Sequence, residues 1–116
     1  MRRMLIVDDE RDICDLLQEF FSARGFAVVS AFSGEEALER LCGQTADVIL
    51  LDVLLPGLSG LEVLRRAKQL YPHARVVMVT AIDQEEVRTQ ATRYGAEAYI
   101  TKPFDFADPA WSSLLV

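Results

Sequence analysis

The fold of this chain is decided by residues 48–60, which read VILLDVLLPGLSG. The first four residues are an uninterrupted apolar run, which is typical of a parallel strand with helices packed on both faces. Asp52 ends the run, and Ser59 and Glu62 have the Ser-x-x-Glu spacing of a capping box, whose side chains satisfy backbone N–H groups at a helix start. The stretch therefore predicts a buried strand, a loop and a helix in succession.

The same succession recurs along the whole chain. Further strands are expected at 4–7, 26–29, 76–79 and 98–100. Between them, capping signals at Ser33 to Glu36 and at Asp83 to Glu86 open helices, and apolar residues at helical spacing fill 13–21. Parallel strands need crossover connections, and helices provide them. The alternation thus predicts a doubly wound α/β domain with a five-stranded parallel sheet.

The composition restricts the classes of protein to which the chain can belong. Its 116 residues carry 18 acidic and 12 basic side chains, a net charge of -6, and the basic ones are scattered, which disfavours direct binding of nucleic acid. The longest apolar runs are four residues, too short for a membrane span or the core of a signal peptide. We therefore expect a cytoplasmic protein.

We expect residues 1–116 to form a single domain. Cys14 and Cys42 are too few for a disulfide framework, and we expect both to be reduced and to lie in or near the core. The final helix has a good start signal at Asp108-Pro109, but only residues 110–116 remain, which is about two turns. It is either a short helix or a truncated one.

Polar residues stand where four of the predicted strands end. Asp8 and Asp9 follow the first strand, Asp52 follows the third and Thr80 the fourth, and Lys102 comes two residues after the fifth. In an open parallel sheet the carboxyl ends of the strands border the ligand crevice. We therefore expect these five side chains to converge there.

Such a convergence calls for a cation. Two carboxylates about 4 Å apart repel each other by about 4 kcal/mol at an effective dielectric constant near 20, and Lys102 supplies only one positive charge. Oxygen ligands alone are available at this edge, because His73 lies in a loop after the third predicted helix and neither cysteine is near. Mg²⁺ suits such a ligand set better than Zn²⁺.

A carboxylate beside Mg²⁺, a lysine and a hydroxyl group is suited to phosphoryl transfer. Asp52 can attack a phosphoryl group, while Lys102 and the metal neutralise the developing charge and Thr80 donates a hydrogen bond. The product would be an aspartyl phosphate.

Five segments between Met4 and about Phe106 resemble the receiver domains of bacterial two-component response regulators, including those of chemotaxis-regulator-like proteins. The segments are Val7-Asp8-Asp9-Glu10, Leu51-Asp52-Val53 with Leu55-Pro56-Gly57, Val79-Thr80-Ala81, Gly95-Ala96 to Tyr99, and Lys102-Pro103-Phe104. Each segment alone is weak, but five in order, each at a strand end, are specific. The resemblance implies a flavodoxin-like receiver fold with strand order 2-1-3-4-5 and, here, a short final helix.

The resemblance also implies a role for each acidic residue at the strand ends. Asp52 would be the phosphoacceptor. Mg²⁺ would be bound by the side chains of Asp9 and Asp52, by the backbone carbonyl of Leu54, and by Asp8 through water.

Further roles are implied around the phosphoryl group. Thr80, Lys102 and the backbone N–H of Ala81 would contact it, and the Lys102-Pro103 peptide bond would be cis. Tyr99 matches the switch aromatic of the family, which swings inward when Thr80 moves toward the phosphoryl group.

By the same resemblance the chain is a signalling switch that accepts a phosphoryl group from a histidine kinase or histidine phosphotransfer protein. It would catalyse its own phosphorylation and dephosphorylation. Its signal would leave through the fourth helix, the fifth strand and the final helix, toward a downstream effector protein or a missing C-terminal output domain. The alternatives are a metal-dependent phosphatase, whose usual second aspartate is replaced by Leu54, and a receiver-like module that only binds.

Two apolar residues flank the predicted site. Leu54 follows Asp52 by two positions, and Ile82 follows Thr80 by two. In the family these positions border the path of the water that hydrolyses the aspartyl phosphate. Our hypothesis is that the two bulky side chains exclude this water and make the phosphorylated form long-lived.

Overall fold

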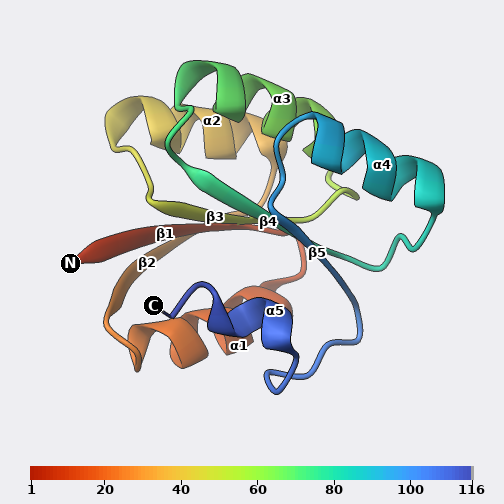
Figure 1. The fold of residues 1–116 in the computed structure, drawn as a ribbon. Coiled ribbons are helices and arrows are strands. Elements are labelled where there is room, and N and C mark those ends of the chain that lie inside the picture. The colour runs from red at the N-terminus through yellow and green to blue at the C-terminus, as the bar shows by residue number, and fades with distance from the viewer. Residues whose placement is uncertain (116) are drawn as a thin grey trace.

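The computed structural model describes residues 1–115, and Val116 lies outside the described residues. Its elements are β1 (Arg2–Val7), α1 (Arg11–Ser22), β2 (Phe26–Ala31), α2 (Gly34–Gly43), β3 (Val48–Leu51), α3 (Gly60–Leu70), β4 (Arg75–Thr80), α4 (Glu85–Arg93), β5 (Ala98–Thr101) and α5 (Pro109–Ser112). All five strands run parallel in one sheet, in the order β2-β1-β3-β4-β5 (Figure 1). The predicted fold and strand order are confirmed. No helix in the described range is long and apolar enough to cross a bilayer.

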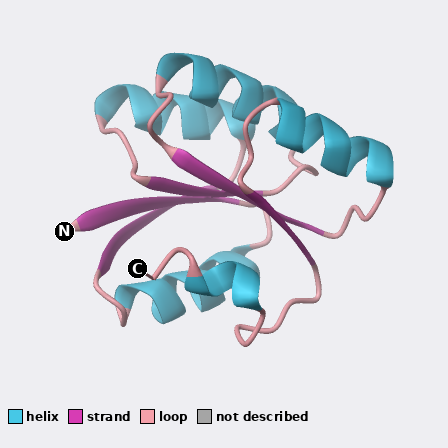
Figure 2. Cartoon of the chain, in the orientation of Figure 1, coloured by secondary structure: helices cyan, strands magenta, loops and turns pink. Residues whose placement is uncertain are grey.

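Helices cover both faces of the sheet. α2, α3 and α4 lie on one face, and α1 and α5 lie on the other (Figure 2). The side chains of the strands alternate between the two resulting cores. In β1, Leu5 and Val7 pack into the core under α2 and α3, whereas Met4 and Ile6 pack into the core under α1 and α5. The continuous apolar runs therefore pack the strands from both sides, and the buried polar and charged residues of the described chain lie at strand ends.

Two of the predicted helix starts use serine caps. The Ser33 hydroxyl accepts a hydrogen bond from the backbone N–H of Glu36 at 3.1 Å. The Glu36 carboxylate accepts one from the backbone N–H of Phe32 at 2.7 Å, one residue before the N-cap, so the two side chains satisfy donors on both sides of the start of α2. Ser59 caps α3 by accepting a hydrogen bond from the backbone N–H of Leu61 at 3.2 Å. Glu62, however, pairs with two arginines further along α3, so the second half of that predicted box is absent.

The predicted cap of α4 is wrong. α4 begins at Glu85, and Gln84 occupies the N-cap position without a side-chain capping bond. Asp83 instead accepts a hydrogen bond from Arg88 Nε at 2.9 Å. The Asp83 carboxylate, which the sequence spacing predicts to cap the backbone of α4, therefore binds the Arg88 side chain instead.

The final helix is short, as predicted, but it is a single turn, Pro109–Ser112, rather than about two. Trp111 anchors it: the side chain is buried, and its ring centroid lies 5.3 Å from that of Phe104 and 5.5 Å from that of Phe106. The indole Nε1 donates a hydrogen bond to the carbonyl of Asp105 at 3.1 Å. Aromatic packing therefore holds this short helix on the sheet.

Both cysteines are free, as predicted. Cys14 is buried in the core under α1. Cys42 is exposed near the end of α2, so its predicted place in or near the core is wrong. Leu41, one position earlier, takes the buried position at this end of the helix.

Candidate functional site

Lys102 lies among carboxylates at the carboxyl ends of the strands. Its Nζ atom lies 2.7 Å from Asp8 Oδ2, 3.0 Å from Asp52 Oδ2 and 2.9 Å from Glu10 Oε1. Asp8 follows β1, Asp52 follows β3 and Lys102 follows β5, so three strands bring these groups to one place. The structure thus joins Asp8, Asp52 and Lys102 as the strand-end pattern predicts.

Polar burial is concentrated at this edge of the sheet. Among the described residues, the buried polar or charged ones are Asp8, Asp52 and Thr80, which are at most 4% exposed. Burying polar groups is unfavourable unless they are paired, and such groups gather mainly where function requires them. The burial therefore marks the strand ends as the candidate site.

The backbone around Asp52 is held by several close contacts. The Asp52 N–H donates to the carbonyl of Val7 at 3.0 Å, and the N–H of Leu54 donates to Asp52 Oδ1 at 3.1 Å. Gly60, at the start of α3, packs directly on the Asp52 backbone: a Cβ atom there would lie 1.9 Å from the Asp52 carbonyl oxygen. The loop can close over the strand end only because residue 60 lacks a side chain.

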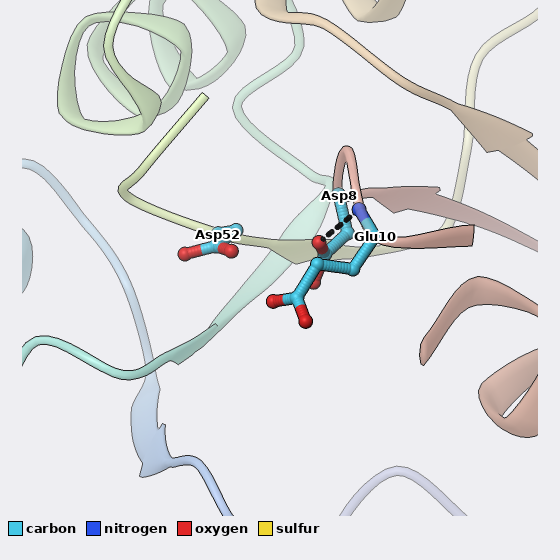
Figure 3. Close-up of side chains that lie close together, drawn as sticks. All are labelled: Asp8, Glu10 and Asp52. Carbon is cyan, nitrogen blue, oxygen red and sulfur yellow. Dashed lines mark hydrogen bonds between the residues drawn. The ribbon is translucent and has the colours of Figure 1, made fainter. Parts of the chain in front are cut away.

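The turn after β1 orients Asp8. The N–H of Glu10 donates to Asp8 Oδ1 at 2.9 Å, which is the bond drawn in Figure 3. The Cys14 thiol of α1 donates to the Asp8 carbonyl at 3.3 Å. Because this turn folds back on Asp8, the carboxylates of Asp8 and Glu10 both point toward Lys102.

The charges of the site shift the pKa values of its members. Burial raises the pKa of the Asp8 carboxyl group, although hydrogen bonds from Lys102 and from the Glu10 N–H oppose the rise. Burial alone would lower the pKa of the Lys102 ammonium group, but its bonds to Asp8, Glu10 and Asp52 outweigh this effect and raise it. Lys102 is therefore held in its charged form.

Three carboxylates at this edge could hold a metal ion. Asp8, Glu10 and Asp52 each offer one oxygen, and these oxygens all lie within 4.8 Å of one another. With one ammonium group among them, the group carries a surplus of two negative charges (-3 + 1 = -2). An oxygen-only donor set with this surplus fits Mg²⁺.

Glu10 is the member of this group that the sequence reasoning missed. Asp9, which the resemblance predicts to be a ligand, is exposed and does not belong to the group of three. Its role in metal binding stays a prediction. The acidic run from Asp8 to Glu10 contained a signal for Glu10, but only the turn geometry shows which of the carboxylates face Lys102.

The remaining predicted residues lie around this group. Thr80 ends β4, and its carbonyl accepts a hydrogen bond from the Lys102 N–H at 2.8 Å. The Lys102–Pro103 peptide bond is cis, as the resemblance implies. Tyr99 is half-buried, and its hydroxyl donates to the carbonyl of Ile82 in the loop after Thr80, at 2.6 Å. Ala81, in that loop, is exposed.

Comparison with known proteins agrees with this geometry. The family model described as the response regulator receiver domain matches residues 4–109. A CheY-like response regulator receiver domain protein from Methanospirillum hungatei JF-1 is 31% identical, with a TM-score of 0.93, over 99% of this chain and 94% of that protein.

Two further solved structures carry ligands. The response regulator TrrA from Thermotoga maritima, in complex with Mg²⁺ and BeF, is 33% identical over 100% of both chains, with a TM-score of 0.86. A Burkholderia pseudomallei response regulator, solved with a phosphorylated aspartic acid, a calcium ion and citrate, is 28% identical over 99% of this chain and 65% of that one, with a TM-score of 0.87. Since the family model spans nearly the whole chain and includes every strand end described above, this chain belongs to the response regulator receiver domain family.

Proposed function

We propose that residues 1–116 form one receiver domain of a two-component phosphorelay, which accepts a phosphoryl group on Asp52 from a histidine kinase or a histidine phosphotransfer protein. The observation that carries the proposal is the position of Lys102 Nζ, 2.7 Å from Asp8 and 3.0 Å from Asp52, both buried. The phosphorylated aspartic acid in the Burkholderia pseudomallei relative supports it. This role would place the domain in the cytoplasm.

Mg²⁺ is the metal that we assign to the site. Following the resemblance, Asp9 and Asp52 would bind it through side chains, Leu54 through its backbone carbonyl and Asp8 through water. When bound, Mg²⁺ supplies positive charge that stabilises the oxygens of a phosphoryl group in transfer. The complex of Thermotoga maritima TrrA with Mg²⁺ and BeF supports this choice of metal.

The residues of the chain itself supply the rest of the chemistry. A carboxylate oxygen of Asp52 attacks phosphorus, the bond between phosphorus and the donor nitrogen breaks, and its electron pair stays on the histidine ring. Lys102, Thr80 and the N–H of Ala81 donate hydrogen bonds to the phosphoryl oxygens. Hydrogen-bond donors aimed at these oxygens stabilise the negative charge that develops on them in the transition state.

The signal would leave through the face formed by α4, β5 and α5. Tyr99 would act as the switch when Thr80 moves toward the phosphoryl group, and an effector protein or a C-terminal output domain would bind the changed face. α4 supports this route because Ala91 is its one buried residue, and weakly anchored segments move most readily. Amide hydrogen exchange in residues 83–95 should change on phosphorylation, and unchanged exchange would contradict this output face.

The domain would also hydrolyse its own aspartyl phosphate, slowly. Leu54 is 55% exposed and Ile82 is half-buried, so apolar surface would border the path of the attacking water. Replacing both residues, Leu54→Asn with Ile82→Glu, should speed dephosphorylation. An unchanged rate of loss of the phosphoryl group, followed by intact mass, would show that these side chains do not exclude water.

The proposed function is tested by intact-mass analysis after incubation with acetyl phosphate, with and without Mg²⁺. Wild-type protein should gain one phosphoryl group only with Mg²⁺, and Asp52→Asn should gain none. Asp15→Asn, an exposed aspartate of α1, is the matched control and should behave as wild type.

Other results would favour other functions. If the wild-type protein forms no adduct under activating conditions, the domain is a receiver-like binding module that is not phosphorylated. Rapid release of phosphate from added phosphoesters would indicate a phosphatase that works through an aspartyl intermediate.

A further inference from the structure

Glu10 is the outermost of the three carboxylates around Lys102. Its side chain is 60% exposed, whereas those of Asp8 and Asp52 are 3% and 4% exposed. Glu10 occupies the N-cap position of α1, yet its side chain makes no capping bond and contacts Lys102 Nζ at 2.9 Å instead. A negative charge therefore stands on the solvent side of the site.

Lys102 has no hydrogen-bond donor to spare. An ammonium group has three N–H donors, and three carboxylates surround it at 2.7, 2.9 and 3.0 Å. A phosphoryl group bound to Asp52 needs one of these donors. Breaking the bond to Asp8 would leave an unpaired buried charge, which is costly, whereas an exposed ion pair such as that with Glu10 contributes little. The hydrogen bond between Lys102 and Glu10 is therefore the one that breaks when a phosphoryl group binds.

We propose that Glu10 determines which phosphodonors the domain accepts, by opposing small anionic ones such as acetyl phosphate; this inference rests on the proposed function. A small dianion must approach past the Glu10 charge and displace it from Lys102, and it has no contacts outside the site to offset the repulsion. A donor protein meets the same charge, but contacts outside the site supply binding energy that offsets it. Glu10 thus makes the domain more responsive to protein donors than to free acyl phosphates.

The chemistry leaves Glu10 itself unchanged. A carboxylate oxygen of Asp52 forms the new bond to phosphorus, the bond from phosphorus to the acetate oxygen breaks, and acetate leaves with the electron pair. No proton has to be transferred. One N–H of Lys102 that donates to Glu10 then donates to a phosphoryl oxygen instead, and the Glu10 side chain turns toward solvent.

The test is the rate of adduct formation with acetyl phosphate and saturating Mg²⁺, measured by intact mass at several donor concentrations. Glu10→Gln keeps the shape and a hydrogen-bond acceptor but removes the charge, and it should react about three- to tenfold faster than wild type at low salt. Glu10→Ala should also react faster. The gain should shrink between about 0.1 M and 1 M salt, because the screening length falls from about 10 Å to about 3 Å.

Glu19→Gln is the matched control for the loss of one negative charge. Glu19 is an exposed residue of the same helix, nine positions further on, or about 14 Å along the axis at 1.5 Å per residue. Its rate should equal that of the wild type. An equal gain in both variants would reveal a general charge effect and overturn the assignment to Glu10.

Two other results would also overturn it. If Glu10→Ala reacts more slowly and Glu10→Gln restores the wild-type rate, Glu10 only positions Lys102. If calorimetric titration shows that Glu10→Gln binds Mg²⁺ tenfold or more weakly, Glu10 is a metal ligand. Equal rates in all variants would overturn this inference alone, whereas the absence of any adduct, wild type included, would overturn the proposed function as well.

Discussion

The hydroxyl group of Tyr99 donates a hydrogen bond of 2.6 Å to the backbone carbonyl of Ile82, which joins β5 to the loop between β4 and α4. The guanidinium group of Arg88, from α4, lies 4.6 Å from the centroid of the Tyr99 ring and pairs with Asp83 at 2.9 Å. Since this loop begins directly after Thr80, Tyr99 connects the candidate site with α4 through both its hydroxyl and its ring.

Tyr99→Phe should loosen the loop before α4. The change removes one hydrogen bond, which contributes about 0.5–1.5 kcal/mol, so amide exchange in residues 82–88 should become up to about tenfold faster. Tyr94→Phe is the control, because its hydroxyl only accepts a bond from the exposed Gln90. Equal exchange in the two variants would mean that the bond to Ile82 does not hold the loop.

Gly60→Ala should impair both stability and phosphorylation, because the new methyl group would overlap the Asp52 carbonyl. We expect a loss of about 1–3 kcal/mol in the free energy of unfolding, measured in urea, and slower formation of the acetyl phosphate adduct. Gly43→Ala, at the end of α2, meets no atom within 4 Å and should be neutral or slightly stabilising. A Gly60→Ala protein as stable as Gly43→Ala would show that the α3 start does not constrain Asp52.

The ion pair between Arg75 and Glu97 should make stability depend on pH. Hydrogen bonding to Arg75 lowers the pKa of Glu97 below its ordinary value of 4.5, against the opposing effect of burial. The pair therefore stabilises the fold fully above about pH 4.5, and this contribution is lost as the pH falls through the lower folded pKa. Glu97→Gln should cost up to about 1 kcal/mol at pH 7, and progressively less as the pH falls below 4.5.

The check is urea unfolding of both proteins across this pH range. Glu39→Gln, an exposed residue of α2, serves as control and should show no such dependence. A constant difference between wild type and Glu97→Gln from pH 7 to pH 2 would contradict the assignment.

The two cysteines should differ strongly in reactivity. Burial, with the nearby Asp8 charge, raises the pKa of the Cys14 thiol to about 11, so little thiolate exists at neutral pH. Cys42 is exposed. Iodoacetamide at pH 8 should modify Cys42 first, as mapped by peptide mass, and Cys14 only after unfolding in urea. Equal labelling of both in the native protein would be the contrary result.

The sheet was predictable from sequence because its signals are local. Continuous apolar runs indicate strands covered on both faces, and the structure divides the side chains of β1 between two cores. The strand-end rule then placed Asp8, Asp52 and Lys102 together without knowledge of any distance.

Two of the failures depend on the choice among partners in space, which a linear pattern does not contain. Asp83 had the spacing of a cap, but Arg88 offers its carboxylate a charged partner. Glu10 was missed because its part in the group depends on the turn that its own N–H makes with Asp8. A linear pattern shows which groups are available, whereas the choice among partners depends on geometry.

The aromatic cluster at the C-terminal end contains Trp111, whose fluorescence can be measured without a label. Trp111 is the only tryptophan in the chain, and although it is far from Asp52 in sequence, it contacts Phe104, two residues after Lys102, with ring centroids 5.3 Å apart. Its indole also binds the carbonyl of Asp105. A shift of the segment that carries Lys102 would alter the surroundings of this indole, so intrinsic fluorescence should report phosphorylation of Asp52 in real time, without a label.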